Sequence, residues 1–322
     1  MKVLITGATG SLGRALVRRL IDLKIAETIV AFSRGEWAQA MLAEELGQPK
    51  ELKWMIGDIR DVDRVADALS RVDTVLHCAA LKRLDLAAND PLEIFKTNLV
   101  GTANIVRAAV RRNVPRILVV SSDKAAASST VYGTSKAAAE AIAVHANMLG
   151  HPQVRVSATR WGNVLTSRGA AVHLWRRQVA RGEPVTITDS RMTRFIITMA
   201  DAVEFLLRAL HEMRGGEIFV PVLPSARIVD LADAVAASAA MKIIGLRADG
   251  EKIHETLVSE DEVPRTVVVS GLGYVIQPAR PTWPYTPWRG NPLSGPYRSD
   301  TNPDWLEPDQ IRRMLAEVPE EP

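Results

Sequence analysis

Cysteine is nearly absent from this sequence: Cys78 is the only one in 322 residues, so no disulfide can form within the chain. No uninterrupted apolar run approaches the roughly 18 to 20 residues that a membrane-spanning helix needs. The first residues also lack the charged segment, apolar core and cleavage site of a signal peptide. Basic residues are scattered and the net charge is only +3, which does not favour nucleic-acid binding. We therefore expect a cytoplasmic protein in a reducing setting, with no membrane or nucleic-acid partner.

A glycine-rich turn follows the first apolar run. Residues 2–5 form a short run that is apolar from Val3 onward, Thr6-Gly-Ala-Thr-Gly-Ser-Leu-Gly13 comes next, and apolar residues with helical spacing follow. Glycines at these positions permit a tight turn and a close approach of the backbone to a pyrophosphate, while the helix N-terminus offers free N–H groups to the anion. The pattern predicts a dinucleotide-binding turn. The cofactor contacts expected there are Gly7, Gly10, Ser11, Leu12 and Gly13.

The ends of the second and third expected strands bear on the choice of cofactor. The run 28–32 ends in Ser33 and Arg34, where folds that prefer NAD usually carry an acid for the ribose hydroxyls. Because a guanidinium can pair with a 2′-phosphate, we expect NADP rather than NAD, although Arg34 could also be a solvated surface residue. The third run, 52–59, ends near Asp58 and Ile59, which we also expect at the cofactor. Asp58 could instead cap the helix that follows.

Two pairs of ionisable residues are spaced for acid–base chemistry. Tyr132 and Lys136 are four residues apart, so on a helix they share one face, and the lysine is expected to lower the phenol pKa and to hold a nicotinamide ribose. Asp123 and Lys124 follow the apolar run 116–120 and would stand at the carboxyl end of a strand, where open α/β sheets bind ligands. The first pair predicts proton removal from an alcohol. The second pair suits proton removal with loss of water.

Apolar runs and helical patterns alternate along the chain, which predicts an α/β fold with a doubly wound parallel sheet. We expect helices near 62–70, 92–112, 132–149, 171–181 and 200–212, the last returning to the sheet with a strand at 217–220. The segment 277–302 is rich in Pro, Trp, Tyr and Gly and is expected to be irregular chain clamped onto the body. Pro308 then starts a helix that includes residues 311–317. The six strands expected before residue 160 are 2–5, 28–32, 52–59, 74–77, 116–120 and 154–159.

Several segments together resemble one family. Thr6-Gly-x-x-Gly-x-x-Gly13 combined with Tyr132-x-x-x-Lys136 resembles the extended short-chain dehydrogenase/reductases. Ser122-Asp-Lys-Ala125, Arg191-Met-Thr-Arg-Phe195 and Gly250-Glu-Lys-Ile-His-Glu255 narrow the resemblance to the inverting UDP-N-acetylglucosamine 4,6-dehydratases of polysaccharide biosynthesis. The resemblance covers residues 1 to about 260. It implies a Rossmann-type NADP-binding domain at 1–160, with a returning segment at about 196–222. A smaller α/β nucleotide-sugar-binding lobe and tail would comprise 161–195 and 223–322.

The resemblance also implies a reaction, the conversion of UDP-N-acetylglucosamine to a UDP-4-keto-6-deoxy-hexosamine with inversion at C5. Tyr132 would take the proton of the sugar 4-hydroxyl while Lys136 holds the ribose. Lys124, as a free base, would remove the C5 proton, and Asp123, protonated, would donate to the departing C6 hydroxyl. Two further cofactor contacts are expected at Cys78 and Ala80. Contacts with the UDP-N-acetylhexosamine are expected at Lys82, Asn98, Asn163, Arg168, Thr188, Arg194, Arg247 and Glu251.

Some alternatives stay open. A UDP-sugar 4-epimerase would share Tyr132, Lys136 and the glycine turn but would not need Asp123 and Lys124. A combined dehydratase and 5-epimerase, or a non-catalytic NADP-binding protein, would also fit parts of the pattern. The loop from Gly245 to Lys252 is one residue longer than in relatives and lacks their proline, which weakens its expected hold on uridine. No metal site is expected, and the resemblance implies a homo-oligomer.

Overall fold

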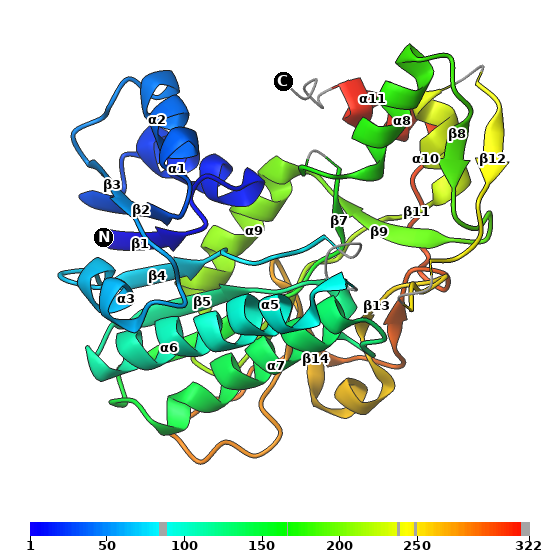
Figure 1. Cartoon of the computed structure of the whole chain (residues 1–322). Coiled ribbons are helices and arrows are strands. Elements are labelled where there is room, and N and C mark those ends of the chain that lie inside the picture. The colour runs from blue at the N-terminus through cyan, green and yellow to red at the C-terminus, as the bar shows by residue number, and fades with distance from the viewer. Residues whose placement is uncertain (84–88, 166, 237–238, 248–249, 317–322) are drawn as a thin grey trace.

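The computed structural model describes residues 1–322 except 84–88, 166, 237–238, 248–249 and 317–322 (Figure 1). Its main sheet has ten strands in the order β16-β14-β15-β10-β6-β5-β4-β1-β2-β3. The strands from β10 to β3 in this order are parallel to their neighbours within the group. They are β1 (Lys2–Thr6), β2 (Thr28–Ser33), β3 (Leu52–Ile56), β4 (Thr74–His77), β5 (Arg116–Val120), β6 (Arg155–Thr159) and β10 (Ile218–Val220).

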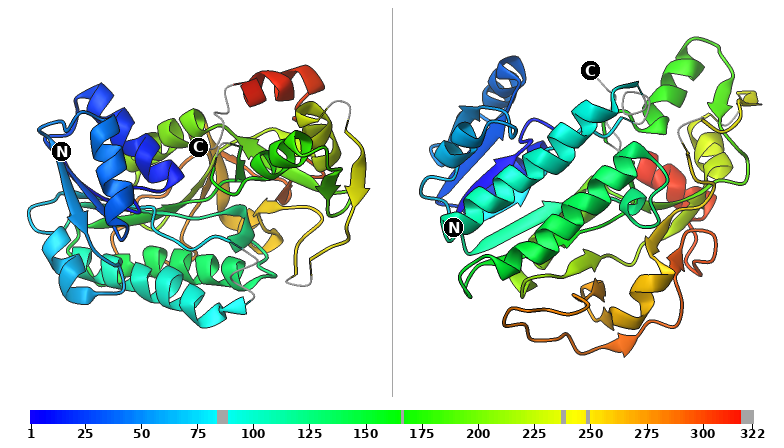
Figure 2. Two further views of the ribbon diagram at one scale, coloured as in Figure 1. Left: turned by 45° about the horizontal axis from the view of Figure 1, so that its top comes forward. Right: turned by 60° about the horizontal axis from the view of Figure 1, so that its bottom comes forward.

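Helices cover both faces of this sheet, which confirms the expected doubly wound α/β fold (Figure 2). On one face α3 packs on α6 and α6 packs on α7, while α1 packs on α9 on the other face. Among the residues that the structure describes, no helix is both long and apolar enough to cross a membrane. The helices are α1 (Ser11–Leu23), α2 (Glu36–Glu45), α3 (Val62–Ala68), α5 (Pro91–Phe95), α6 (Thr102–Arg111), α7 (Val131–His145) and α9 (Met199–Glu212).

The helix expected over 92–112 contains an irregularity. A π-helical turn, Lys96–Gly101, separates α5 from α6. The Thr102 hydroxyl donates to the Asn98 carbonyl at 2.6 Å, so a side chain competes for a backbone acceptor inside the helix. Gly101 also lies against Ile59, with no room for a side chain. The helical periodicity was therefore predicted correctly, but its wider turn depends on these contacts, which the sequence alone did not reveal.

A second, smaller core lies beside the main sheet. The strands β7 (Asn163–Val164), β9 (Thr193–Ile197) and β11 (Ser225–Arg227) form one small sheet, and β8 (Val185–Ile187) pairs with β12 (Met241–Ile243). Packed with them are α8 (Ala171–Ala180), α10 (Ile228–Val235) and α11 (Pro308–Ala316). The expected helix starts at Pro308 and at residue 171 are confirmed, while residue 317 lies outside the described residues. Side chains that fill this core include Val172, Trp175, Ile187, Leu231 and Ile311.

Part of the C-terminal segment belongs to the main sheet and not to the smaller lobe, which differs from the expected division at residue 223. β14 (Thr266–Val269), β15 (Gly273–Ile276) and β16 (Asn291–Pro292) extend that sheet beyond β10 in antiparallel fashion. The segment after β15 is attached to the body of the protein by tryptophan hydrogen bonds, as expected. The Trp288 indole donates to Glu217 at 3.0 Å, and the Trp283 indole donates to the Gly215 carbonyl at 3.2 Å. The short run 266–269 is apolar, yet nothing local in the sequence says which sheet it joins.

Candidate active site

The Asp123–Lys124 pair lies at the carboxyl end of β5, in a 3₁₀ turn over Asp123–Ala125. Helix α7 packs against this turn, and its cap residue Thr130 accepts a hydrogen bond from the Gly133 N–H at 3.0 Å. Gly133 itself lies against the Lys124 carbonyl, and a Cβ atom there would collide with that oxygen. The glycine therefore allows the start of α7, with Tyr132, to approach the turn that carries Asp123 and Lys124.

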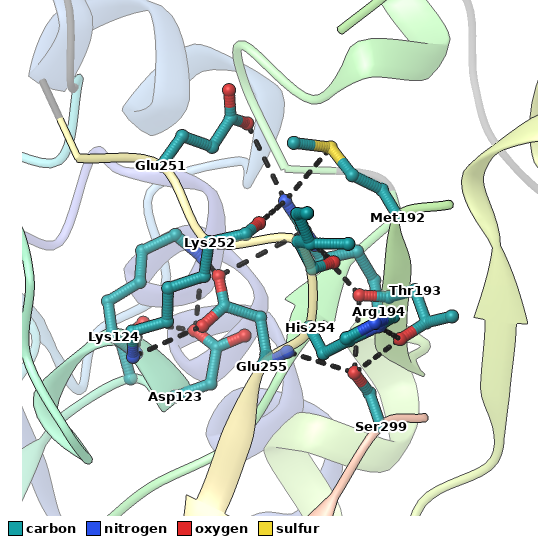
Figure 3. A network of polar contacts seen from close by, with 12 residues as sticks. Asp123, Lys124, Met192, Thr193, Arg194, Glu251, Lys252, His254, Glu255 and Ser299 are labelled. Carbon is teal, nitrogen blue, oxygen red and sulfur yellow. Dashed lines mark hydrogen bonds and ion pairs between the residues drawn. The ribbon is translucent and has the colours of Figure 1, made fainter. Parts of the chain in front are cut away.

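Lys124 is held between two buried carboxylates (Figure 3). Its Nζ atom lies 3.2 Å from Asp123 Oδ1 and 3.2 Å from Glu255 Oε1. Burial lowers the pKa of Lys124, but the charges of Asp123 and Glu255 outweigh burial and raise the pKa above the ordinary lysine value. These charges favour the ammonium form of Lys124, so the free base that the expected elimination requires has to form by transfer of a proton from Nζ.

Asp123 is almost fully buried, with 1% of its surface exposed. Its Oδ1 atom accepts from the Ser122 hydroxyl at 2.7 Å and from Lys124 Nζ at 3.2 Å. Its Oδ2 atom has no hydrogen-bond partner in the part of the chain that the structure describes. A buried acceptor without a donor is costly, so Oδ2 is the atom of this carboxylate that is open to a proton or to a substrate hydroxyl.

Tyr132 and Lys136 share a helix face but do not act on each other as expected. The Lys136 ammonium donates to the Val120 carbonyl at 2.6 Å, and burial lowers the Lys136 pKa to about 8. Burial raises the pKa of Tyr132, against the opposing effects of the Lys124 charge and a hydrogen bond with Ser122. The predicted lowering of the phenol pKa by Lys136 is thus wrong in this state. Lys124 is the cation that favours the phenolate.

The glycine turn has the geometry expected of a dinucleotide site. Gly7 has a φ of 68°, and a Cβ atom on it would lie only 2.8 Å from the α-carbon of Ala79. The Gly10 N–H donates to the Gly7 carbonyl at 2.9 Å and α1 starts at the next residue, so the free N–H groups of α1 face the turn.

Cys78, another expected cofactor contact, lies beside the turn, and its N–H donates to the Thr6 carbonyl at 3.2 Å. Burial raises the Cys78 pKa to about 12. Leu12 and Gly13 continue into α1, and Ala80 follows Cys78 in the segment after β4.

A buried histidine that the sequence analysis did not single out supports the same turn. His77 Nδ1 lies 2.7 Å from the Thr6 hydroxyl, and His77 Nε2 lies 2.9 Å from the Thr102 hydroxyl. Burial lowers the His77 pKa to about 3, so the ring is neutral. It joins the ends of β1 and β4 to the start of α6. Its position as the last residue of β4 was visible in the sequence, but its two partners were not.

The ends of β2 and β3 carry a cluster of charges. Arg34 is 52% exposed, and its Nη1 atom lies 3.8 Å from Asp58 Oδ2. Asp58 is mainly bound by Arg60, whose Nε and Nη2 atoms donate to Oδ2 at 3.0 and 2.7 Å. Asp58 does not cap α3, because Asp61 does so by accepting from the Arg64 N–H. Ser33 accepts from the Gln39 amide at 2.9 Å.

The expected substrate residues differ in how far they are already engaged. Asn98 is buried, and its amide group bonds to the Leu81 backbone and to the Ser135 hydroxyl, so it fixes the chain after β4. Any contact of Asn98 with a sugar would have to share its oxygen or replace one of these bonds. Thr188 donates to the Met192 sulfur at 2.9 Å. The remaining exposed candidates are Lys82, Asn163 and Arg168, the last donating its N–H to Ser11 Oγ at 3.0 Å.

Arg194 and Arg247 were both expected to bind the diphosphate and uridine, yet they have different environments. Arg194 is 4% exposed, and its guanidinium donates to the carbonyls of Thr193, Ile253 and Lys252 at 2.8 to 3.0 Å. Its first role in the structure is to hold the chain over 251–255. Arg247 is half-exposed and pairs with Glu251 at 3.1 Å. Because the Arg247 guanidinium is exposed to solvent, it can break its ion pair with Glu251 at low cost, and it is therefore better placed than Arg194 to contact a ligand.

Three residues near the catalytic pair were not among the candidates from the sequence. Ser122 bonds to Asp123, Glu255 bonds to Lys124, and Lys252 Nζ lies 3.6 Å from Glu255 Oε2. Ser122 was detectable because it directly precedes Asp123. Glu255 and Lys252 lie in the segment 250–255 that carried the family resemblance, but their distance in sequence from Lys124 hid the contact.

Comparison with known proteins assigns the family. Residues 3–275 match the family described as polysaccharide biosynthesis protein. The chain belongs to this family. It is 39% identical over 279 residues to a UDP-N-acetylglucosamine 4,6-dehydratase (inverting) of Campylobacter jejuni, covering 86% of this chain and 83% of that protein. It is also 37% identical over 271 residues to a UDP-glucose 4-epimerase of Rickettsia canadensis, covering 82% and 79%.

Solved structures agree with the fold. The X-ray structure of Pen from Bacillus thuringiensis superposes with a TM-score of 0.90 at 29% identity, covering 98% of this chain and 97% of that one. A dTDP-glucose 4,6-dehydratase from Streptomyces venezuelae, solved with NAD bound, gives a TM-score of 0.70 at 22% identity, covering 79% and 87%. These likenesses confirm the extended short-chain dehydrogenase/reductase fold, and the named dehydratase relatives agree with the expected enzyme class.

Proposed function

We propose that the chain catalyses NADP-dependent dehydration of UDP-N-acetylglucosamine to a UDP-4-keto-6-deoxy-hexosamine, with inversion at C5. The observation that carries the proposal is the pair of the buried Asp123 and Lys124 next to Tyr132 at the carboxyl end of β5. Oxidation at C4 requires a tyrosine and a hydride acceptor, whereas loss of water also requires an acid and a base near C5 and C6. This site has groups for both tasks. The relative named as an inverting dehydratase supports the same substrate and stereochemistry.

The residues of the glycine turn fit a nicotinamide dinucleotide. The bare backbone at Gly7 and the free N–H groups at the start of α1 would hold its pyrophosphate. When bound, the nicotinamide would supply the hydride acceptor for C4 and the hydride donor for C6. The neighbour solved with NAD supports a cofactor of this class. We propose NADP because Arg34 is an exposed cation at the end of β2 and Asp58 is already occupied by Arg60.

The acid and the base can arise together from one proton transfer. Lys124 Nζ lies 3.2 Å from Asp123 Oδ1, so its proton can move to the carboxylate and leave a neutral amine beside a carboxylic acid without change in net charge. Tyr132 would take the proton of the 4-hydroxyl, and the resulting C4 ketone would acidify the C5 hydrogen. Lys124 would then remove the C5 proton, the C5–C6 double bond would form, and the C6–O bond would break. The Asp123 proton would complete the water.

The experiment is to incubate the purified protein with UDP-N-acetylglucosamine in D₂O and to follow the sugar by mass spectrometry and proton NMR. We expect loss of one water, deuterium at C5 and coupling constants of the inverted isomer. Lys124→Ala should lower turnover about 10²-fold or more, because it removes the base. Lys50→Ala, at an exposed lysine, serves as the control. A sugar that keeps its mass in the wild type would refute the dehydratase proposal.

The epimerase named among the relatives is the second candidate. An epimerase would need Tyr132, Lys136 and a bound nicotinamide but not Asp123 and Lys124, and it would leave the mass of the sugar unchanged. It would also tolerate Lys124→Ala with little loss of turnover. The Asp123–Lys124 pair favours the dehydratase, since loss of water needs an acid and a base in addition to Tyr132 and epimerisation does not.

A further inference from the structure

Glu255 is the second carboxylate that binds Lys124, and it reaches the site from a distant part of the chain. It immediately precedes β13 (Thr256–Val258). Its side chain is 2% exposed, and its Oε1 atom is as close to Lys124 Nζ, 3.2 Å, as Asp123 Oδ1 is. Its backbone is fixed by Ser299, whose hydroxyl accepts from the Glu255 N–H and whose N–H donates to the Glu255 carbonyl, both at 2.9 Å. The carboxylate is thus placed against Lys124 by a rigid segment.

The other side chains around this carboxylate leave it only partly satisfied. Lys252 Nζ lies 3.6 Å from Oε2 and Arg194 Nε lies 4.0 Å from Oε1. Within the described part of the chain, Oε2 receives no hydrogen bond. Lys124 is therefore its closest cation. The titratable and charged groups that face Lys124 are Asp123 from its own turn, Tyr132 from α7, Arg194 from β9, and Lys252 and Glu255 from the segment before β13.

Building on the proposed dehydratase function, we propose that Glu255 is a positioning residue for the elimination, which shares the Lys124 ammonium with Asp123 and holds its Nζ atom in place. The geometry gives this role a physical basis. Two carboxylates at equal distance fix the Nζ atom between them, so the amine is already in place when it passes a proton to Asp123. A single carboxylate would leave the flexible lysine side chain free to turn away.

The role predicts a definite effect of charge removal. Glu255→Gln keeps the shape and one oxygen but removes the negative charge 3.2 Å from the ammonium. Even with water-like screening, unit charges at that distance change a protonation equilibrium by about tenfold. The fraction of Lys124 present as the free amine at a given pH below its midpoint should therefore rise about tenfold or more. A purely structural role for Glu255 would leave this fraction unchanged, since glutamine preserves the packing.

A labelling experiment that needs no sugar tests the inference. The free protein is acetylated with trace acetic anhydride from pH 6 to pH 10, and the peptide containing Lys124, which is 21% exposed, is quantified by mass spectrometry. We expect Lys124 in Glu255→Gln to react at least about tenfold faster than in the wild type at neutral pH. Glu260→Gln is the control, because it removes an exposed carboxylate in the turn that follows β13. Equal Lys124 labelling in all three proteins would overturn the proposal.

The wild type alone gives a second readout that does not depend on the folding of a variant. Lys124 should become reactive at a higher pH than the exposed Lys50, and a lower pH for Lys124 would overturn the inference. If the protein also removes water from UDP-N-acetylglucosamine, the rise of kcat with pH should occur at lower pH in Glu255→Gln. If Lys124 is acetylated faster in Glu255→Gln as expected but no sugar loses water, the dehydratase proposal fails. The inference that Glu255 holds the Lys124 ammonium would then still stand.

Discussion

Replacing Glu262 with glutamine should destabilise the fold by about 3 kcal/mol at neutral pH. Glu262 lies in the 3₁₀ turn Glu260–Arg265 and accepts from Arg160 Nη1 at 2.8 Å and Nη2 at 2.9 Å. Burial raises the pKa of Glu262, but Arg160 and Ser259 outweigh burial and lower it to about 2. The difference from the ordinary value of 4.5 corresponds to about 3 kcal/mol of folding free energy.

The sign of the pH dependence follows from the direction of that shift. Because the pKa of Glu262 is lower in the folded state, its contribution is fully present above the unfolded pKa near 4.5 and is lost as the pH falls toward 2. The stability difference between the wild type and Glu262→Gln should therefore be constant from pH 7 to about pH 5. At pH 3.5 it should be smaller by about 1 kcal/mol.

Urea unfolding followed by tryptophan fluorescence, with seven tryptophans in the chain, measures this difference. Glu260→Gln in the same turn is the control, since Glu260 is exposed and its loss should change stability by less than about 0.5 kcal/mol. A difference below about 1 kcal/mol for Glu262→Gln at pH 7 would refute the reasoning, as would one that is the same at pH 7 and pH 3.5. In either case the Arg160–Glu262 pair would not stabilise the fold as the distances imply.

Three further substitutions test other parts of the structure. Arg34→Ala should weaken binding of NADP about tenfold relative to NAD, measured by fluorescence titration, because it removes the cation expected at the 2′-phosphate. Gly133→Ala should lower turnover about tenfold or more while the far-UV circular dichroism is retained, since the new Cβ would collide with the Lys124 carbonyl and displace α7. Trp288→Phe should cost about 1 to 3 kcal/mol in urea unfolding, because the buried Glu217 carboxylate loses the indole N–H.

The sequence predicted the fold and the position of Asp123 and Lys124 through local signals. Alternating apolar runs and helical patterns located the strands from β1 to β6, and the position of Asp123 and Lys124 after an apolar run placed them correctly at the end of β5. Contacts between segments far apart in the sequence could not be predicted from these local patterns. The spacing of Tyr132 and Lys136 fixes a shared helix face, but not that the Lys136 ammonium turns to the Val120 carbonyl. Similarly, nothing within the run 266–269 indicates that β14 would extend the main sheet.

The protonation state of Lys124 shows most clearly why the rest could not be predicted. From the sequence, the adjacent Asp123 was visible but its distance from the ammonium was not, and burial favours a free amine. In the structure the charges of Asp123 and of Glu255, which lies more than a hundred residues away in the chain, together outweigh burial and raise the Lys124 pKa. A pKa depends on every charge within a few ångströms, so it can be derived only after the tertiary contacts are known.

Two buried arginines, Arg194 and Arg160, hold the chain on either side of Glu255 and so place its carboxylate near Lys124. Arg194 donates to the carbonyls of Lys252 and Ile253, and so fixes the chain directly before Glu255. Arg160, at the end of β6, joins Glu140 on α7 to Glu262 and also donates to the Leu257 carbonyl at 2.8 Å, just after Glu255. The rigid guanidinium fork suits this task, because one side chain can satisfy several acceptors in different segments. The segment that bears Glu255 is therefore held on both sides, by Arg194 from β9 in the smaller lobe and by Arg160, which also binds Glu140 on α7.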